Sequence, residues 1–189
     1  MHKTRLEAFS DGVVAIIITI MVLELRLPGG ADWTALRSLG PTFCAYVLSF
    51  IYLGIYWNNH HHLFHLVDRV TGGMLWANLH LLFWLSLVPF ATNWMGEHPH
   101  DALPTAVYGG VLICAAIAYT ILTRVIIRAQ GPHSRLKAAV GGDAKGYVSL
   151  AIYLASIAVT LVRHEIAWAG FVLVALVWLV PDTRIERVL

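Results

Sequence analysis

The chain has 189 residues, of which 58% are hydrophobic and only 13% are charged. This balance, with a mean hydropathy of +0.69, excludes an ordinary soluble domain and indicates an integral membrane protein. The formal net charge of +2 is too small, and its charges too dispersed, to indicate nucleic-acid binding. Cys44 and Cys114 both lie inside apolar segments, so neither a disulfide framework nor a cysteine-based metal site is indicated.

Six apolar stretches are long enough, or nearly so, to cross a bilayer, because about 20 apolar residues span the hydrocarbon core as a helix. They cover approximately residues 7–27, 39–65, 73–93, 103–127, 146–163 and 165–181. Only Arg163, His164 and Glu165 separate the last two, which are near the short limit, so a single bent element is an alternative there. We predict an all-α integral membrane protein with one six-helix domain over residues 1–189.

The basic residues are unevenly divided between the two sides of this predicted topology. Arg26, Arg37 and Arg163 fall on one side. The other ten of the thirteen fall on the side of the termini: Lys3, Arg5, Arg69, Arg124, Arg128, Arg135, Lys137, Lys145, Arg184 and Arg187. Because cytoplasmic segments are enriched in Lys and Arg, we predict that both termini are cytoplasmic. The longest polar connection, Arg128 to Lys145, lies on this side and is expected to be a loop.

The first apolar segment, Arg5 to Pro28, carries two stripes at helical spacing. One consists of small side chains: Ala8, Gly12, Ala15 and Thr19. The second consists of bulky apolar side chains: Phe9, Val13, Ile16, Ile20, Leu23 and Leu27. A small-residue stripe lets another membrane helix approach closely. The bulky stripe either faces lipid or, where several copies meet around an axis, forms hydrophobic rings that gate a pore by dewetting.

Three polar residues at the start of this segment, Arg5, Ser10 and Asp11, need partners. Arg5 and Asp11 are six residues apart, so they project from different sides of one helix and do not form an i,i+4 pair. Ionisable groups at a membrane boundary are costly and are candidates for function. One interpretation gives them partners on another helix, a neighbouring subunit or water. In the other, Arg5 snorkels to the headgroups while Ser10 and Asp11 cap the helix.

Histidines are concentrated at the end of the second apolar stretch: His60, His61, His62 and His65. His61 and His65 share one face of a helix at a spacing that zinc sites use. A metal-handling or haem-binding protein would need a further ligand, for which Asp68 and His80 are candidates. The favoured interpretation is that the histidines hydrogen-bond across helices, where the start of the first helix docks, and that no metal is bound.

The third apolar stretch contains Asn78 and His80, which we predict to form a second buried polar point. The sequence has no nucleophile-and-base arrangement, no glycine-rich phosphate loop and no multi-histidine iron pattern. We therefore do not expect an enzyme.

The first segment begins with the pattern RxxxFSD, at Arg5, Phe9, Ser10 and Asp11. This pattern, the GVVAIIITIMVLEL that follows it, and the runs 56–64 and 77–92 resemble the transmembrane protein 175 family. That family comprises the potassium channels of endolysosomes and their prokaryotic relatives, and this chain resembles the prokaryotic branch. The resemblance spans essentially all six predicted helices.

The resemblance implies a homotetramer in a prokaryotic plasma membrane that passes K⁺ passively, without a cofactor, around a central pore lined by the first helix. Its implied partners are other copies of the chain, the lipid bilayer and potassium ions. The pore constriction falls on Ile16, Ile20 and Leu23, and a position linked to selectivity falls on Thr19. The implied polar network that holds the pore helices consists of Arg5, Phe9, Ser10, Asp11, His60 and His61.

Glu24, near the outer end of the first helix, has two interpretations. Four copies of its carboxylate would concentrate cations at the outer mouth of the pore. Alternatively, Glu24 pairs with Arg26 or Arg37 in the first connection.

Overall fold

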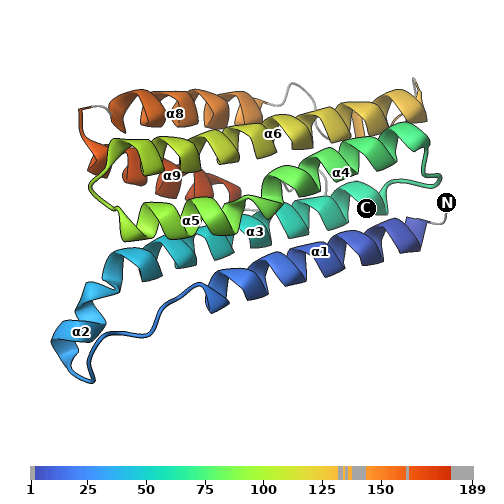
Figure 1. The fold of residues 1–189 in the computed structure, drawn as a ribbon. Helices are drawn as coiled ribbons and strands as arrows, with labels where there is room; N and C mark the ends of the chain where they lie inside the picture. The colour runs from blue at the N-terminus through green and yellow to red at the C-terminus, as the bar shows by residue number, and fades with distance from the viewer. Residues whose placement is uncertain (1–2, 132–133, 135, 138–143, 161, 180–189) are drawn as a thin grey trace.

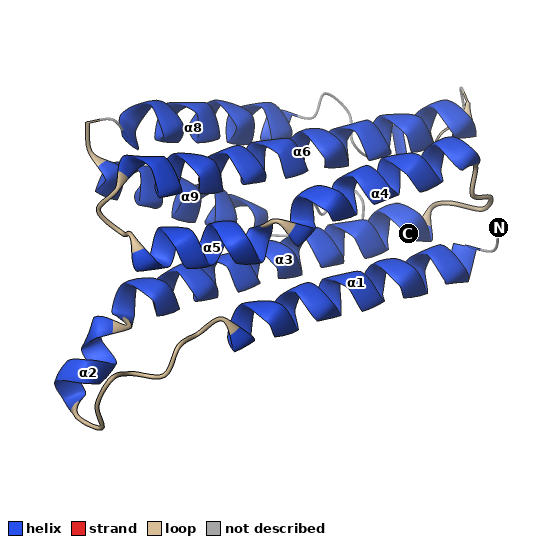
Figure 2. Cartoon of the chain, viewed as in Figure 1, coloured by secondary structure: helices blue, strands red, loops and turns tan. Residues whose placement is uncertain are grey.

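The computed structural model describes residues 3–131, 134, 136–137, 144–160 and 162–179. Its long elements are all helices, which lie roughly side by side in a bundle (Figures 1 and 2). Their bounds are α1 Lys3–Leu23, α2 Trp33–Ser38, α3 Gly40–His65, α4 Gly72–Ser86, α5 Val88–Glu97, α6 Ala102–Gln130, α8 Ala144–Thr160 and α9 His164–Leu179. Much of the predicted loop from Arg128 to Lys145, and the end of the sixth predicted span, lie outside the described residues.

Four helical spans in the described ranges are long and apolar enough to cross a membrane: α1, α3, the α4–α5 pair and α6. The prediction of an all-α membrane protein is therefore confirmed. The six-helix count holds approximately, because α8 and α9 are apolar helices of only 17 and 16 residues. These two are separate helices that pack on each other, rather than one bent element.

The third predicted span is broken in the middle. α4 ends at Ser86 and α5 begins at Val88, with Pro89 in the first turn of α5. Proline fits the first turn of a helix, where its missing N–H costs nothing, but it interrupts a continuous one. The break allows the two halves to pack differently, so that α4 lies mainly against α6 and α5 lies against α3 and α6 (Figure 1).

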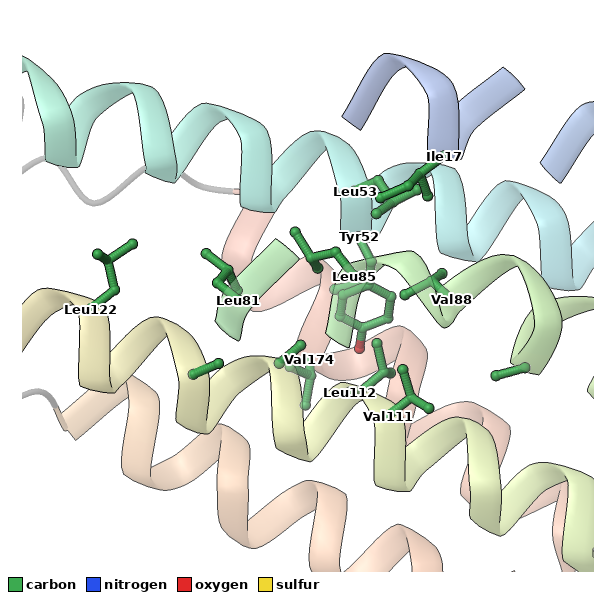
Figure 3. Packing of buried hydrophobic residues seen from close by; sticks show 14 of the residues in the cluster. Ile17, Tyr52, Leu53, Leu81, Leu85, Val88, Val111, Leu112, Leu122 and Val174 are labelled. Atoms are coloured by element: carbon green, nitrogen blue, oxygen red, sulfur yellow. The ribbon is translucent and has the colours of Figure 1, made fainter. Parts of the chain in front are cut away.

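The hydrophobic core lies where α3, α4, α5, α6 and α9 face one another. Figure 3 shows Tyr52 and Leu53 of α3 among Leu85, Val88 and Leu112. The core hydroxyls are satisfied internally, as where the Tyr52 hydroxyl donates to the carbonyl of Phe171 at 2.6 Å.

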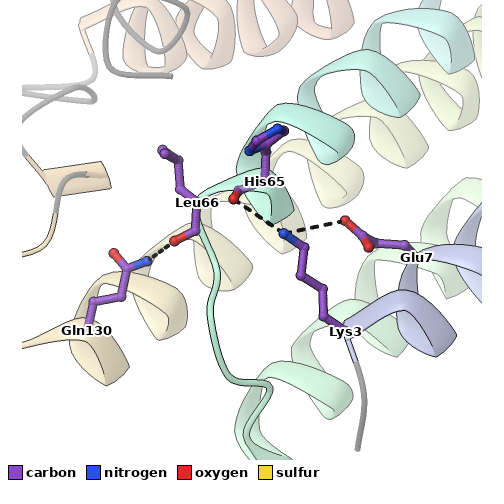
Figure 4. A network of polar contacts seen from close by, with 5 residues as sticks. All are labelled: Lys3, Glu7, His65, Leu66 and Gln130. Carbon is purple, nitrogen blue, oxygen red and sulfur yellow. Dashed lines mark hydrogen bonds and ion pairs between the residues drawn. The ribbon is translucent and has the colours of Figure 1, made fainter.

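The start of α1 and the ends of α3 and α6 meet at one end of the bundle (Figure 4). The Lys3 ammonium donates to the carbonyl of His65 at 3.3 Å and lies 4.0 Å from Glu7. Gln130 Nε2 donates to the carbonyl of Leu66 at 2.7 Å. We call this the basic end, because it also carries Arg5, Arg69, Arg124 and Arg128.

Candidate functional site on the first helix

α1 packs on the rest of its own chain through a narrow stripe that the sequence patterns did not reveal. Its buried residues are Leu6, Ser10, Val14, Ile17 and Met21. Nearly every residue of this helix is apolar, so hydrophobicity does not distinguish the face that packs from those that do not. The visible signal was Ser10, a hydroxyl that avoids lipid by lying on the buried face.

Most of both stripes predicted from the sequence lies outside this contact, although Val13 of the bulky stripe is half-buried against the core. On the bulky stripe, Phe9, Ile16, Ile20 and Leu23 expose 52%, 59%, 42% and 76% of their surface. All four residues of the small stripe are exposed, and a Cβ added at Gly12 would meet nothing within 4 Å. The helix that the small stripe was predicted to admit is therefore not one of this chain's own described helices.

The three stripes of α1 have a definite angular order. At 100° per residue, the bulky stripe lies about 100° from the buried stripe and about 90° from the small-residue stripe, on opposite sides. Thr19, on the small stripe, donates its hydroxyl to the carbonyl of Ala15 at 2.8 Å. Its hydrogen-bonding demand is thus met within the helix, although the side chain is exposed.

A buried chain of hydrogen bonds fixes the position of α1 on the bundle. Asn78 Nδ2 of α4 donates to Ser10 Oγ at 2.9 Å, and Ser10 Oγ donates to the carbonyl of Leu6 at 2.9 Å. Asn78 Oδ1 lies 2.8 Å from Nε2 of His60 on α3. Because this amide oxygen only accepts, His60 carries its proton on Nε2. Ser10 and His60 are thus joined through Asn78, which the predicted network did not include.

The remaining predicted network residues are arranged differently. Trp57 Nε1 donates to Asp11 Oδ1 at 2.9 Å, and the Trp57 ring stacks on His61 with centroids 6.4 Å apart. Asp11 and His61 are therefore linked through Trp57, at the exposed surface of α1 and α3. Arg5 and Phe9 are exposed, and neither enters the network within the described part of the chain.

The prediction that His80 is buried is wrong. His80 is exposed on α4, where its Nε2 accepts a hydrogen bond from Trp84 Nε1 at 3.0 Å. The residue turns outward because it lies two positions beyond Asn78, on another face of the helix. His61 and His65 do approach each other, with ring centroids 6.2 Å apart. In the described ranges, however, no three His, Cys, Asp or Glu side chains gather as a metal site would need.

At the opposite end of the bundle from Lys3, Arg26 forms an ion pair with Glu97 at 3.3 Å rather than with Glu24. Glu24 Oε2 is buried and makes no hydrogen bond. Burial first, and then the neighbouring Glu97 carboxylate, raise the pKa of Glu24 above its ordinary value. The interpretation in which Glu24 pairs with Arg26 or Arg37 is therefore not what this protomer adopts.

Residues 5–89 match the family described as "Endosomal/lysosomal potassium channel TMEM175". A protein from Chryseobacterium sp. named "Potassium channel" is 57% identical over 187 residues, covering 99% of this chain and 97% of the relative. The chain belongs to the TMEM175 family. The recognition made from RxxxFSD and the neighbouring runs is confirmed.

Two further relatives place the chain within the TMEM175 family. The crystal structure of a Chamaesiphon minutus homolog of the lysosomal potassium-selective channel TMEM175 superposes with a TM-score of 0.81 at 28% identity. The match covers 95% of this chain and 97% of that one. The mouse "Endosomal/lysosomal proton channel TMEM175" is 36% identical over 118 residues, which are 54% of this chain but only 24% of the mouse protein.

Proposed function

We propose that this chain is a potassium or cation channel, in which four copies surround a pore lined by α1. Its relative from Chryseobacterium is named a potassium channel, and the similar crystal structure is that of a homolog of a potassium-selective channel. Channels of this kind conduct passively, so the proposed protein uses no cofactor and catalyses no covalent step. Potassium is its permeant ion.

The observation that carries the proposal is the exposed bulky stripe of α1, which lies between the buried stripe and the small-residue stripe of the same helix. One neighbouring face packs on the same chain, and the other presents small side chains that admit a helix of another copy. If its own chain covers the buried stripe and a helix of another copy covers the small-residue stripe, the bulky stripe between them faces the axis around which the copies are arranged. Ile16, Ile20 and Leu23 would then form successive rings, which constrict the pore and exclude water.

In this assembly the buried Ser10–Asn78–His60 chain has a positioning role. It fixes the rotation of α1 relative to α3 and α4, and therefore the direction in which Ile16 points. None of the three side chains lies on the bulky stripe, so they would not contact the ion. Thr19 flanks the stripe and would be adjacent to the pore.

The same proposal places the basic end of the bundle in the cytoplasm. Five described basic residues, Lys3, Arg5, Arg69, Arg124 and Arg128, lie there, and cytoplasmic segments are enriched in such residues. The membrane would be the plasma membrane of a prokaryote. Glu24 would lie at the outer mouth, where burial beside Glu97 keeps it protonated to a higher pH than an exposed glutamate.

Potassium flux from liposomes containing the purified protein tests this proposal. We expect flux without an energy source, and we expect Ile16→Asn to increase it severalfold by hydrating the constriction. The matched control is Leu154→Asn on α8, where a similarly exposed apolar side chain lies away from α1. An absence of flux, or a flux unchanged by polar substitutions at Ile16, Ile20 and Leu23, would contradict the pore.

Proton conduction is a second candidate, because the mammalian relatives are named proton channels. A pH-sensitive dye inside the same liposomes, with potassium on both sides, measures it directly. Proton flux without potassium flux would replace the potassium assignment.

The metal-handling or haem-binding alternative makes a different prediction for the same purified protein. It requires bound zinc or a Soret band that disappears in His61→Ala and His65→Ala. Because these two side chains lack a third ligand in the described protomer, we expect neither signal.

A further inference from the structure

A second feature lies on the side of the bundle away from α1. A cavity of about 520 Å³ is enclosed by α3, α6, α8 and α9, a size typical of small-molecule sites. α1 packs on α3, α4 and α5, so the cavity is separate from the proposed pore (Figure 1). Its wall includes exposed Ile117, Ile121 and Tyr147, so it opens to the outside of the bundle, where a membrane protein meets lipid.

The cavity is elongated along the helix axes. Its wall extends from Tyr52 to Leu63 on α3 and from Ala116 to Ile127 on α6. At 1.5 Å per residue each run is about 16 Å long, close to half of a hydrocarbon core of about 30 Å. The slot therefore has the length of one leaflet.

Several polar side chains in the wall are satisfied within the wall itself. Thr120 donates to the carbonyl of Ala116, Thr123 donates to that of Tyr119, and the Asn59 amide donates to that of Ile55, at 2.8–2.9 Å. On the far side, Trp178 Nε1 donates to Ser149 Oγ at 2.8 Å. These four groups therefore do not require water in the cavity.

A basic side chain lies in the described part of the wall. Arg124 lies in the wall, is exposed, and donates to the Tyr147 hydroxyl at 3.3 Å. Lys145 lies with Nζ 4.7 Å from the centroid of the Trp178 ring, which also lines the cavity. None of the described lining residues is acidic. The slot thus carries a cation, Arg124, within one turn of the end of its wall on α6.

We propose that this cavity binds one acyl chain of an anionic phospholipid, whose phosphate contacts Arg124. The acyl chain occupies the slot between α3 and α6, and the headgroup lies beside Arg124. The proposal requires a membrane location but does not depend on which ion the protein conducts.

Native mass spectrometry of the full chain in non-ionic detergent, titrated with phosphatidylglycerol or phosphatidylcholine, tests the site. We expect phosphatidylglycerol to bind more tightly. Arg124→Gln should weaken its binding about fivefold, since one basic side chain near an anionic headgroup contributes on this order. Arg128→Gln is the matched control, because it removes the same charge from an exposed position on α6 outside the cavity. Ala116→Phe, which fills the slot, should reduce the binding of both lipids.

Three results would overturn the proposal: equal binding of the two lipids, an equal effect of the two arginine substitutions, or phosphatidylglycerol binding that survives Ala116→Phe. A change in subunit number in Ala116→Phe without loss of lipid would instead assign the cavity to contact between copies. Thermal unfolding confirms that each variant is folded. If Ala116→Phe fails to fold, the comparison of Arg124→Gln with Arg128→Gln decides alone.

Discussion

Asn78 of α4 links α1 to α3 through hydrogen bonds between buried side chains. Its amide donates to Ser10 of α1 and accepts from His60 of α3, and all three side chains are buried. In an apolar setting such a network is stable only while every member keeps its partner, because each orphaned group bears the full cost of desolvation. Removing the central residue is therefore the most damaging change.

Asn78→Leu should lower the free energy of unfolding by about 1–3 kcal/mol, because it leaves His60 Nε2 buried without a partner. For a chain of this size, the midpoint of thermal unfolding should fall by about 2–4 °C per kcal/mol. The control is His80→Leu, which removes a hydrogen bond from the exposed face of the same helix and should have a smaller effect. The effects of Asn78→Leu and Ser10→Ala should not add, since both break one network. Equal losses in Asn78→Leu and His80→Leu would contradict this role.

At this scale the sequence predicted which polar residues needed partners, but not which partners they would have. Ser10 and His60 were expected to meet, whereas their bridge through Asn78 was not. Asp11 was expected to join the same network but instead accepts from Trp57. A hydrogen bond between helices depends on their relative rotation and depth, and both are set by packing that periodicity does not encode. His80 and Asn78 show the limit, since both were predicted to be buried but only Asn78 is.

α6 shows how single glycines control the approach of whole helices. Gly109 is buried against α8 and α9, and a Cβ there would lie 2.8 Å from Ile157 Cγ1 and 2.9 Å from Phe171 Cζ. Both distances are shorter than carbon atoms tolerate, so the side chains or helices would have to move. The next residue, Gly110, would meet nothing within 4 Å. Membrane helices associate largely by such close packing.

Gly109→Ala should lower the free energy of unfolding by about 1–3 kcal/mol, because it overpacks the contact of α6 with α8 and α9. Gly110→Ala is the matched control on the same helix. It should be neutral or stabilise by about 0.5–1 kcal/mol, because alanine is the better helix former. Thermal unfolding of the two purified variants gives the comparison. The packing argument fails if the two variants have the same midpoint.

The positions of helices along the chain were predictable where a long apolar run alone determines them. The long apolar runs of α1, α3 and α6 cross the bundle as expected, since a run of this length has few alternatives in a membrane. The break after Ser86 was not predicted, although Pro89 marks it, because proline is also tolerated inside membrane helices. The short α2 falls in the first connection, where Asp32 caps it by accepting from the Ala35 N–H at 2.7 Å. Such a local hydrogen bond gives no long periodic signal.

For the whole molecule, the proposed tetramer explains why two stripes of α1 are exposed in a single copy. The bulky and small-residue stripes of α1 are both exposed, and they lie beside the face that packs on the bundle. Lipid would accept the bulky stripe, but it gives no reason for a row of small residues beside it. A helix of a second copy does, because small side chains permit close backbone contact. In the proposed tetramer, the angular order of the stripes would direct Ile16 toward the common axis.

Gly12→Leu should therefore disrupt assembly without unfolding the protomer, because a Cβ there meets nothing within 4 Å in its own chain and the position is exposed. Mass photometry or light scattering in detergent should give four copies for the unmodified protein and fewer for Gly12→Leu, with helical content unchanged. Ala155→Leu is the control, since it enlarges an exposed small residue on α8, on the opposite side of the bundle (Figure 1). An unmodified protein that is monomeric would remove the four-fold pore. A Gly12→Leu variant that remains tetrameric would keep the pore but exclude the small-residue stripe from the contact between copies.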